Sequence, residues 1–392
     1  MVLEFGLLKS GLFQESEAVG DGLGSDPQQV IINSSTVGGE NPLLFGTGSD
    51  GEVVISVDTT LTANMNYLDL TINAGKVLTC NGFSVRVARN LFLKSATSEI
   101  KAGEGLASVA GGAAGGTGNT GTGGNGGASA GVLFVLARTI NGSGKITANG
   151  SAGSNGGDGA VASVAGNGSD GTIGTVLTYR NSALAGSAGG YGTKSTGATG
   201  RGTTSTATTD ITVSAIYGEY LLGVTNYGTT DYAANGGSGA GSRAHVASAT
   251  AHGGAGTGGG GSCRGLGGAG GRSGDGTGSV ANTSGGGGGG GGGAGGIIVI
   301  ATTGLINFST TIQAHGGDGG NGGANAGGGA ASFGKVGGGG GGGGGLIYVF
   351  SPETLTATVT GGAAGSKGSN GNTTSEVAAV AGEDGGVISY LW

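Results

Sequence analysis

The chain contains 392 residues, of which 104 are glycine, only 10% are charged and 5% are aromatic. Three prolines exclude a collagen triple helix, and two cysteines exclude a disulfide framework. A net charge of −7 argues against a nucleic-acid partner, whose phosphates would be repelled. Disordered chains combine low hydrophobicity with high net charge, whereas this chain has a positive mean hydropathy, few charges and several apolar runs, which favours an ordered protein.

Residues 1–50 are of mixed character, and we interpret them as an N-terminal attachment segment. Glu4 and Lys9 interrupt the first apolar stretch, which therefore does not resemble an export signal. No apolar run approaches the ~20 residues that a bilayer-spanning helix needs. Assembly into a virus particle is one route out of a cell that requires no such signal.

Residues 51–109 predict short β-strand rungs separated by turns. Val53–Val57 is the first predicted strand, and apolar and polar residues alternate in Tyr67–Ile72 and in Phe83–Val87, the pattern of a half-buried strand. Shorter apolar stretches follow at Leu91–Leu93 and Ile100. Turns are predicted at Gly75 and at Asn81-Gly82.

A second pattern recurs from residue 110 to residue 392: glycine-rich sequence, an apolar run, a polar turn, a short apolar stretch, and glycine again. The apolar runs are Val132–Leu136, Ile297–Ile300 and Leu346–Phe350, and Val387–Trp392 begins a shortened last copy. Repeats of one strand-turn-strand unit predict rungs that stack, each covering the apolar face of the next.

The glycines between these strands are spaced by three residues. Four such series are Gly112–Gly127, Gly150–Gly159, Gly265–Gly274 and Gly362–Gly371. A period of three matches the polyproline-II-type helix, whose amides must bond to neighbouring helices or to water. Glycine allows the close approach that such bonding requires. A flexible linker is the alternative, but a linker has no reason to keep this register.

Two unbroken runs of nine glycines, Gly285–Gly293 and Gly337–Gly345, are predicted to lie centrally in such a bundle. A helix with neighbours on every side tolerates no side chain, whereas one at the rim needs glycine only along its inner edges. The predicted scaffold residues in these runs are Gly285, Gly289, Gly293, Gly337, Gly341 and Gly345.

Residues 110–392 resemble the glycine-rich receptor-binding adhesins at the tips of long tail fibres in T-even-like bacteriophages. The resemblance rests on the period-three glycines, the nine-glycine runs and the apolar strands that bound them. It implies a sandwich of polyglycine-II helices, with variable loops at its distal end that touch the host surface. The expected fold is therefore all-β or irregular: β-helix-like rungs, then a polyglycine-II sandwich.

The longest interruption of the glycine pattern, about residues 177–235, holds six of the nine tyrosines. Tyrosine among small polar residues is the composition that antibody loops use for contact. Packing around a small local strand core remains the alternative. Together with residues from the next interruption, the candidate receptor-binding residues are Tyr179, Tyr191, Arg201, Tyr217, Tyr220, Tyr227, Tyr232, Arg243, His245 and His252.

No enzyme motif emerges from the sequence. Three histidines scattered among glycines cannot supply a nucleophile, base and orienting acid, and no zinc-like spacing is present. We therefore expect no catalytic residues, no metal and no cofactor. Cys80 and Cys263 are interpreted as free thiols. Asp158 and Asp318, each between glycines, and Asp384, which precedes a glycine, are interpreted as turn formers rather than calcium ligands.

The leading functional hypothesis is a virion receptor-binding protein, located on a tail fibre or another external appendage. Its expected partners are other virion proteins and a bacterial outer-surface protein or polysaccharide, and it would act as a trimer or as a monomeric cap. A structural fibre, capsid or tail decoration protein without receptor binding is the main alternative. Ice binding and a bacterial surface adhesin are further alternatives.

Overall fold

The structure is a computed structural model that describes residues 5–7, 13–15, 42–103, 124–158, 286–324, 336–369 and 378–391. Within these ranges its regular secondary structure is almost entirely β-strand, with one four-residue helix. The elements are β1 (Phe5–Leu7), β2 (Phe13–Glu15), α1 (Pro42–Phe45), β3 (Glu52–Ile55), β4 (Thr59–Thr60), β5 (Met65–Tyr67), β6 (Asp69–Ile72), β7 (Val77–Thr79), β8 (Ser84–Leu93), β9 (Glu99–Lys101), β10 (Val132–Gly142), β11 (Lys145–Thr147), β12 (Ile297–Ala301), β13 (Gly304–Ile306), β14 (Thr311–Gln313), β15 (Leu346–Ser351), β16 (Ala357–Thr358) and β17 (Gly386–Leu391).

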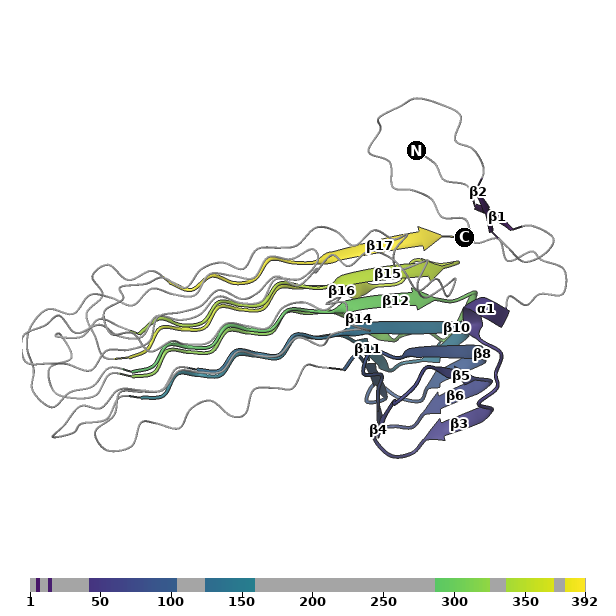
Figure 1. Cartoon of the computed structure of the whole chain (residues 1–392), viewed down its shortest axis with the longest axis horizontal. Helices are drawn as coiled ribbons and strands as arrows, with labels where there is room; N and C mark the ends of the chain where they lie inside the picture. The colour runs from purple at the N-terminus through teal and green to yellow at the C-terminus, as the bar shows by residue number, and fades with distance from the viewer. Residues whose placement is uncertain are drawn as a thin grey trace, which may run out of the picture.

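Apart from the small β1–β2 hairpin, the described strands form two parallel sheets (Figure 1). The nine-stranded sheet follows the order β17-β15-β12-β10-β8-β6-β3, and β13 and β5 attach to β10 and β8. The six-stranded sheet follows the order β16-β14-β11-β9-β7-β4. Apart from β5–β6 and β12–β13, which are consecutive strands of the nine-stranded sheet, the chain visits the two sheets alternately. The sheets run past residue 109 and include strands up to Leu391.

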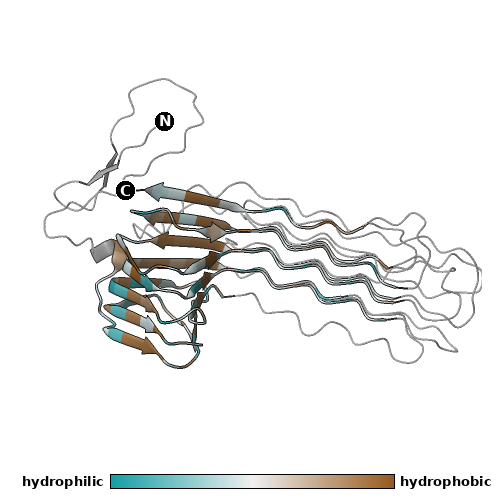
Figure 2. Ribbon diagram, turned by 180° about the vertical axis from the view of Figure 1, so that it is seen from behind, coloured by the Kyte–Doolittle hydropathy of each residue, from teal (hydrophilic) through white to brown (hydrophobic). Residues whose placement is uncertain are grey.

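The apolar strands are buried on both faces. β12 and β15 are buried at every position, and they pair in register from Ile297 with Leu346 to Ala301 with Phe350. Continuous apolar runs rich in β-branched residues are what parallel strands buried on both faces require. In Figure 2 the strands carry most of the hydrophobic colouring of the described residues.

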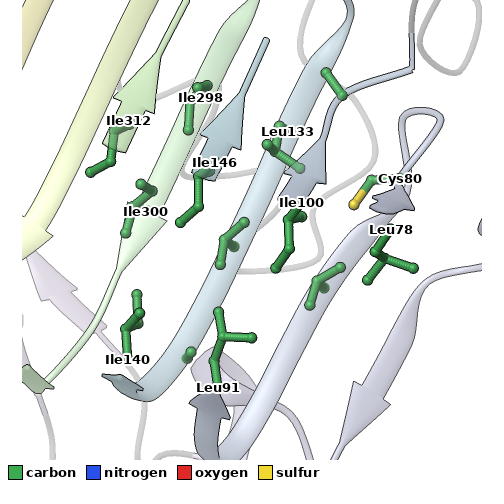
Figure 3. Packing of buried hydrophobic residues seen from close by; sticks show 14 of the residues in the cluster. Leu78, Cys80, Leu91, Ile100, Leu133, Ile140, Ile146, Ile298, Ile300 and Ile312 are labelled. Carbon is green, nitrogen blue, oxygen red and sulfur yellow. The ribbon is translucent and has the colours of Figure 1, made fainter. Parts of the chain in front are cut away.

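The hydrophobic core lies between the two sheets (Figure 3). Leu78, Ile100, Ile146 and Ile312 are register partners across successive strands of the six-stranded sheet, and all four are fully buried. Leu133 and Ile298 form a matching row in the other sheet. Each such side chain contributes roughly 1.5–3 kcal/mol on burial, which makes the stack the main source of stability.

Most strand predictions for residues 51–109 match the structure, with several differences. The predicted strand Val53–Val57 ends at Ile55, and the short strands β4 and β7 were not predicted. The predicted strand Tyr67–Ile72 is divided between β5 and β6, whereas Phe83–Val87 and Leu91–Leu93 belong to one strand, β8. Both predicted turns are present: Gly75 has φ of 68° and Asn81 has φ of 49°. Asn and Gly tolerate these left-handed conformations better than other residues do.

Seven segments, most of them rich in glycine, extend away from the strands in one direction (Figure 1). We name them in chain order S1 (124–131), S2 (148–158), S3 (286–296), S4 (314–324), S5 (336–345), S6 (359–369) and S7 (378–385). S1, S3, S5 and S7 lead into β10, β12, β15 and β17, whereas S2, S4 and S6 begin close after β11, β14 and β16. The two groups therefore run in opposite directions along the molecule.

Candidate functional site

The candidate receptor-binding residues all lie outside the described residues, as does Gly285. The described segments nonetheless fix where these regions begin and end. Residues 159–285 join S2 to S3, residues 325–335 join S4 to S5, and residues 370–377 join S6 to S7. All three connections start and finish at the ends of the segments that lie away from the strands (Figure 1).

Backbone hydrogen bonds join the seven segments in a regular lattice. Gly124, Gly127 and Ala130 of S1 donate to Gly288, Gly291 and Ala294 of S3, so the bonds recur at every third residue. The same period recurs from S3 to S5, from S2 to S4 and from S4 to S6, between segments that run parallel. S1, S3, S5 and S7 therefore form one layer, and S2, S4 and S6 form a second.

The two layers are bonded to each other between segments that run antiparallel. Gly287, Gly290 and Gly293 of S3 donate their N–H groups to Gly157, Ser154 and Ser151 of S2. S3 accepts bonds from S4 as well, through the N–H groups of Gly317, Gly320 and Gly323. S3 and S5, which carry the nine-glycine runs, are each bonded to four other segments, and every described residue in them is buried.

Glycine is required in these segments because the backbones approach too closely for a side chain. A Cβ on Gly290 would lie 1.9 Å from the carbonyl oxygen of Asn125, and one on Gly289 would lie 2.0 Å from that of Gly320. Similar contacts arise at Gly293, Gly341 and Gly345, with nearest oxygens at 1.9–2.1 Å. Of every three consecutive residues in S3, one thus faces an S1 carbonyl and one faces an S4 carbonyl, and neither position has room for a side chain.

The second layer presents every third residue to solvent on its outer side. In S4, Gly317, Gly320 and Gly323 are buried, whereas Asp318 and Asn321 are exposed. S6 has the same pattern, with Gly362, Gly365 and Gly368 buried between exposed Ala363, Ser366 and Ser369. What the two segments share is therefore a buried glycine at every third position, followed by an exposed residue.

Side chains on this outer side hold neighbouring segments together. Side-chain oxygens of S2 accept hydrogen bonds from backbone N–H groups of S4: Asn149 from His315 at 2.8 Å, Asn155 from Asn321 at 2.8 Å, and Asp158 from Ala324 at 2.6 Å. Those of S4 serve S6 in the same way: Asp318 accepts from Ala363 and Asn321 from Ser366, both at 2.7 Å.

The interpretation of Asp158, Asp318 and Asp384 as turn formers is wrong. All three lie in extended segments, and each accepts a backbone N–H of the adjacent segment; for Asp384 the donor is Gly361 at 2.9 Å. The flanking glycines are there for close packing rather than for a turn. The three-residue spacing of Asn and Asp between glycine pairs was the signal that could have revealed this role.

His315 of S4 also accepts a backbone hydrogen bond from S6, as Asp318 and Asn321 do, but with a ring nitrogen instead of an oxygen. Its Nδ1 accepts from the Thr360 N–H at 3.0 Å and lies 2.7 Å from the Thr360 hydroxyl, and its Nε2 lies 3.3 Å from the Thr358 hydroxyl. An accepting Nδ1 requires the neutral ring with its proton on Nε2. Burial lowers the pKa of His315 below its ordinary 6.5, and the negative charge of Asp384 opposes that shift.

Other chemically reactive groups in the described residues are structural. Cys80 is a free thiol in the core, and burial raises its pKa, which leaves it unreactive. Burial also raises the pKa of Tyr67, to about 12. Arg89 bridges Glu52 of edge strand β3 and Asp69 of β6 on the surface.

No group of three or more His, Cys, Asp or Glu side chains within the described ranges could hold a metal ion. In the same ranges, no helix is long and apolar enough to cross a membrane. Comparisons with protein-family models, with curated proteins and with solved structures found no match to this chain.

Proposed function

We propose that the protein is a bacteriophage virion adhesin that displays receptor-binding loops on a rigid glycine-rich scaffold. We infer further that S1–S7 are polyglycine-II-type helices forming a sandwich on β-helix-like rungs. The three-residue hydrogen-bond period supports this inference, since a polyproline-II-type helix has three residues per turn. No glycine of S1–S7 has positive φ, as expected for φ near −75°.

The observation that carries the functional proposal is the direction of the seven segments. A scaffold in which three connections emerge at one end, with residues 177–235 inside the longest of them, is suited to presenting loops at a distance from its base. The tyrosine-rich composition of that connection favours recognition of a bacterial surface protein or polysaccharide. Other virion proteins would hold the opposite end.

The test compares the full chain with a variant in which a glycine–serine linker of equal length replaces residues 177–235. Both are incubated with bacterial envelope fractions, separated into outer-membrane proteins and polysaccharide, and bound protein is measured. We expect the full chain to bind one fraction and the variant to lose binding while its scaffold amides keep the same hydrogen-exchange protection. A folded full chain that binds none of the fractions would favour the structural fibre or decoration protein instead.

A further inference from the structure

A cavity of about 500 Å³ lies at the strand end of the molecule, where the loop before β14 faces the loop before β16. It is lined by Leu305, Asn307–Ile312, Glu353–Thr356 and Thr358. The volume falls within the range of roughly 300–1,000 Å³ that is typical of small-molecule sites. These residues belong to the rungs rather than to the segment connections, so the inference drawn from them does not rest on the proposed function.

The cavity has a fixed apolar floor and one accessible aromatic ring. Ile312 and Leu355 are buried in the core, at 0% and 5% exposure. Phe308 is half-buried and packs against the same core, which holds its ring in place. A ring that is anchored on one side and accessible on the other offers an apolar platform to a ligand.

Several polar side chains around this platform have no other role in the described structure. Asn307, Ser309, Glu353, Thr354 and Thr356 are exposed, and their side chains make no hydrogen bond to another described residue. In contrast, two other lining hydroxyls are already engaged: Thr310 donates to the Gly142 carbonyl at 3.2 Å, and Thr358 lies 3.3 Å from His315 Nε2.

Backbone geometry at Asn307 strengthens the case. Its φ of 46° is left-handed, and it is one of two non-glycine residues with positive φ in the described ranges. The other, Asn81, is explained by its turn with Gly82, whereas the residue after Asn307 is Phe308. Left-handed residues outside ordinary turns concentrate at ligand-binding sites.

The chemistry of the lining selects among ligand classes. Glu353 is the only acidic or basic residue in it, so an anion such as phosphate would be repelled. The hydroxyl and amide groups would be left unpaired by a lipid chain. We propose that this cavity binds a neutral sugar unit, with a C–H face of the sugar on Phe308 and its hydroxyls bonded by Asn307 and Glu353.

The test is saturation-transfer NMR on the full chain with glucose, galactose, mannose and N-acetylglucosamine as probes. A site of this size, binding one sugar unit, predicts a dissociation constant on the order of 1 mM. Phe308→Ala should weaken binding at least about tenfold through loss of the platform. Glu353→Gln changes only an exposed side chain, so it should leave the fold intact, and it should weaken binding about threefold or more.

Phe83→Ala is the matched control, because Phe83 is also a half-buried ring packed against the core but lies in the turn between β7 and β8. It should leave sugar binding unchanged. The proposal is overturned if none of the four sugars receives saturation, if both Phe variants lose binding equally, or if inorganic phosphate displaces the sugar.

Discussion

At the scale of single residues, glycine has two separate uses in this chain. In the turns it supplies left-handed backbone, as at Gly75 with φ of 68°. In S1–S7 it supplies the absence of a side chain, because φ is not positive there and a Cβ would strike a carbonyl oxygen of the next segment. Only the second use demands long runs of glycine.

A single methyl group in S3 should therefore be highly disruptive. Gly290→Ala would place a Cβ 1.9 Å from the Asn125 oxygen, so S1 and S3 would have to separate. We expect a loss of about 3 kcal/mol or more in the free energy of unfolding, measured by denaturant titration. Gly304→Ala is the control, since its nearest contact would be an ordinary 3.7 Å. Equal effects of the two substitutions would contradict the explanation.

His315 should make stability depend on pH. Because burial lowers its folded-state pKa, the unfolded state binds the proton more readily. The stabilising contribution is complete above the unfolded-state value near 6.5, and it is lost as pH falls through the lower folded-state pKa. His315→Asn keeps an acceptor for the Thr360 N–H and should remove this dependence, measured as melting temperature between pH 7.5 and 5. An unchanged pH profile in that variant would show that other groups are responsible.

At the scale of elements, the position of a residue within the three-residue repeat decides whether it faces solvent or a neighbouring segment; we call this position its phase. In S4 the pattern glycine-glycine-X directs X to solvent, and insertion of one residue would rotate every later X toward a neighbouring backbone. Asp318 would then take the place of Gly319, where a Cβ lies 2.1 Å from the Gly339 oxygen.

Insertion of one glycine after Gly316 should therefore prevent stable folding, whereas insertion of Gly-Asn-Gly at the same point keeps the phase and should be tolerated. One glycine inserted between Gly340 and Gly341 should also be tolerated, because every position of that run is already glycine. Thermal unfolding of the three variants tests this. A stable single insertion in S4 would show that phase is not what the spacing encodes.

Asn149, Asn155 and Asp158 of S2 accept backbone hydrogen bonds from S4, but Ala152, at the remaining position of this three-residue spacing, has no side-chain acceptor. By the register of its neighbours this residue faces the N–H of Asp318, which makes no hydrogen bond within the described residues. Ala152→Asn should add that bond and stabilise the protein by about 1 kcal/mol in denaturant titration. Ala363→Asn, in the outermost described row of the second layer, has no described N–H to receive and should give no gain.

The sequence predicted this architecture to differing degrees. Period-two alternation and apolar runs were enough to place β8, β10, β12 and β15, because parallel strands buried on both faces leave a strong local signature. The stacking of those strands and the three-residue period of the glycine segments were also legible. The roles of Asn149, Asp318 and His315 were not predicted, since the local spacing of these residues gives their period but not the partner segment, which lies some 45 or 166 residues away.

At the scale of the whole molecule, each sequence repeat contributes both to the hydrophobic core between the sheets and to the hydrogen-bonded glycine segments. Hydrophobic burial between the sheets sets the position of each rung, and the rung sets the register of the glycine segments that extend from it. The segments themselves bury little apolar side-chain surface, so their cohesion depends on backbone hydrogen bonds, each worth about 1 kcal/mol net. Such a lattice should be stiff where it is bonded on all sides and weaker toward its free surface.

Hydrogen exchange resolved to single residues should display that gradient. The amides of Gly289, Gly290, Gly292 and Gly293 donate to two different segments, S5 and S2, and lie buried, so we expect exchange at least a thousandfold slower than in an unstructured peptide. The Asp318 amide, exposed and unbonded within the described residues, should exchange at close to the peptide rate and should slow on Ala152→Asn. If the S3 glycines exchange as fast as Asp318, the hydrogen-bonded lattice does not hold these segments. The proposal that they form a rigid scaffold for loops would then be contradicted.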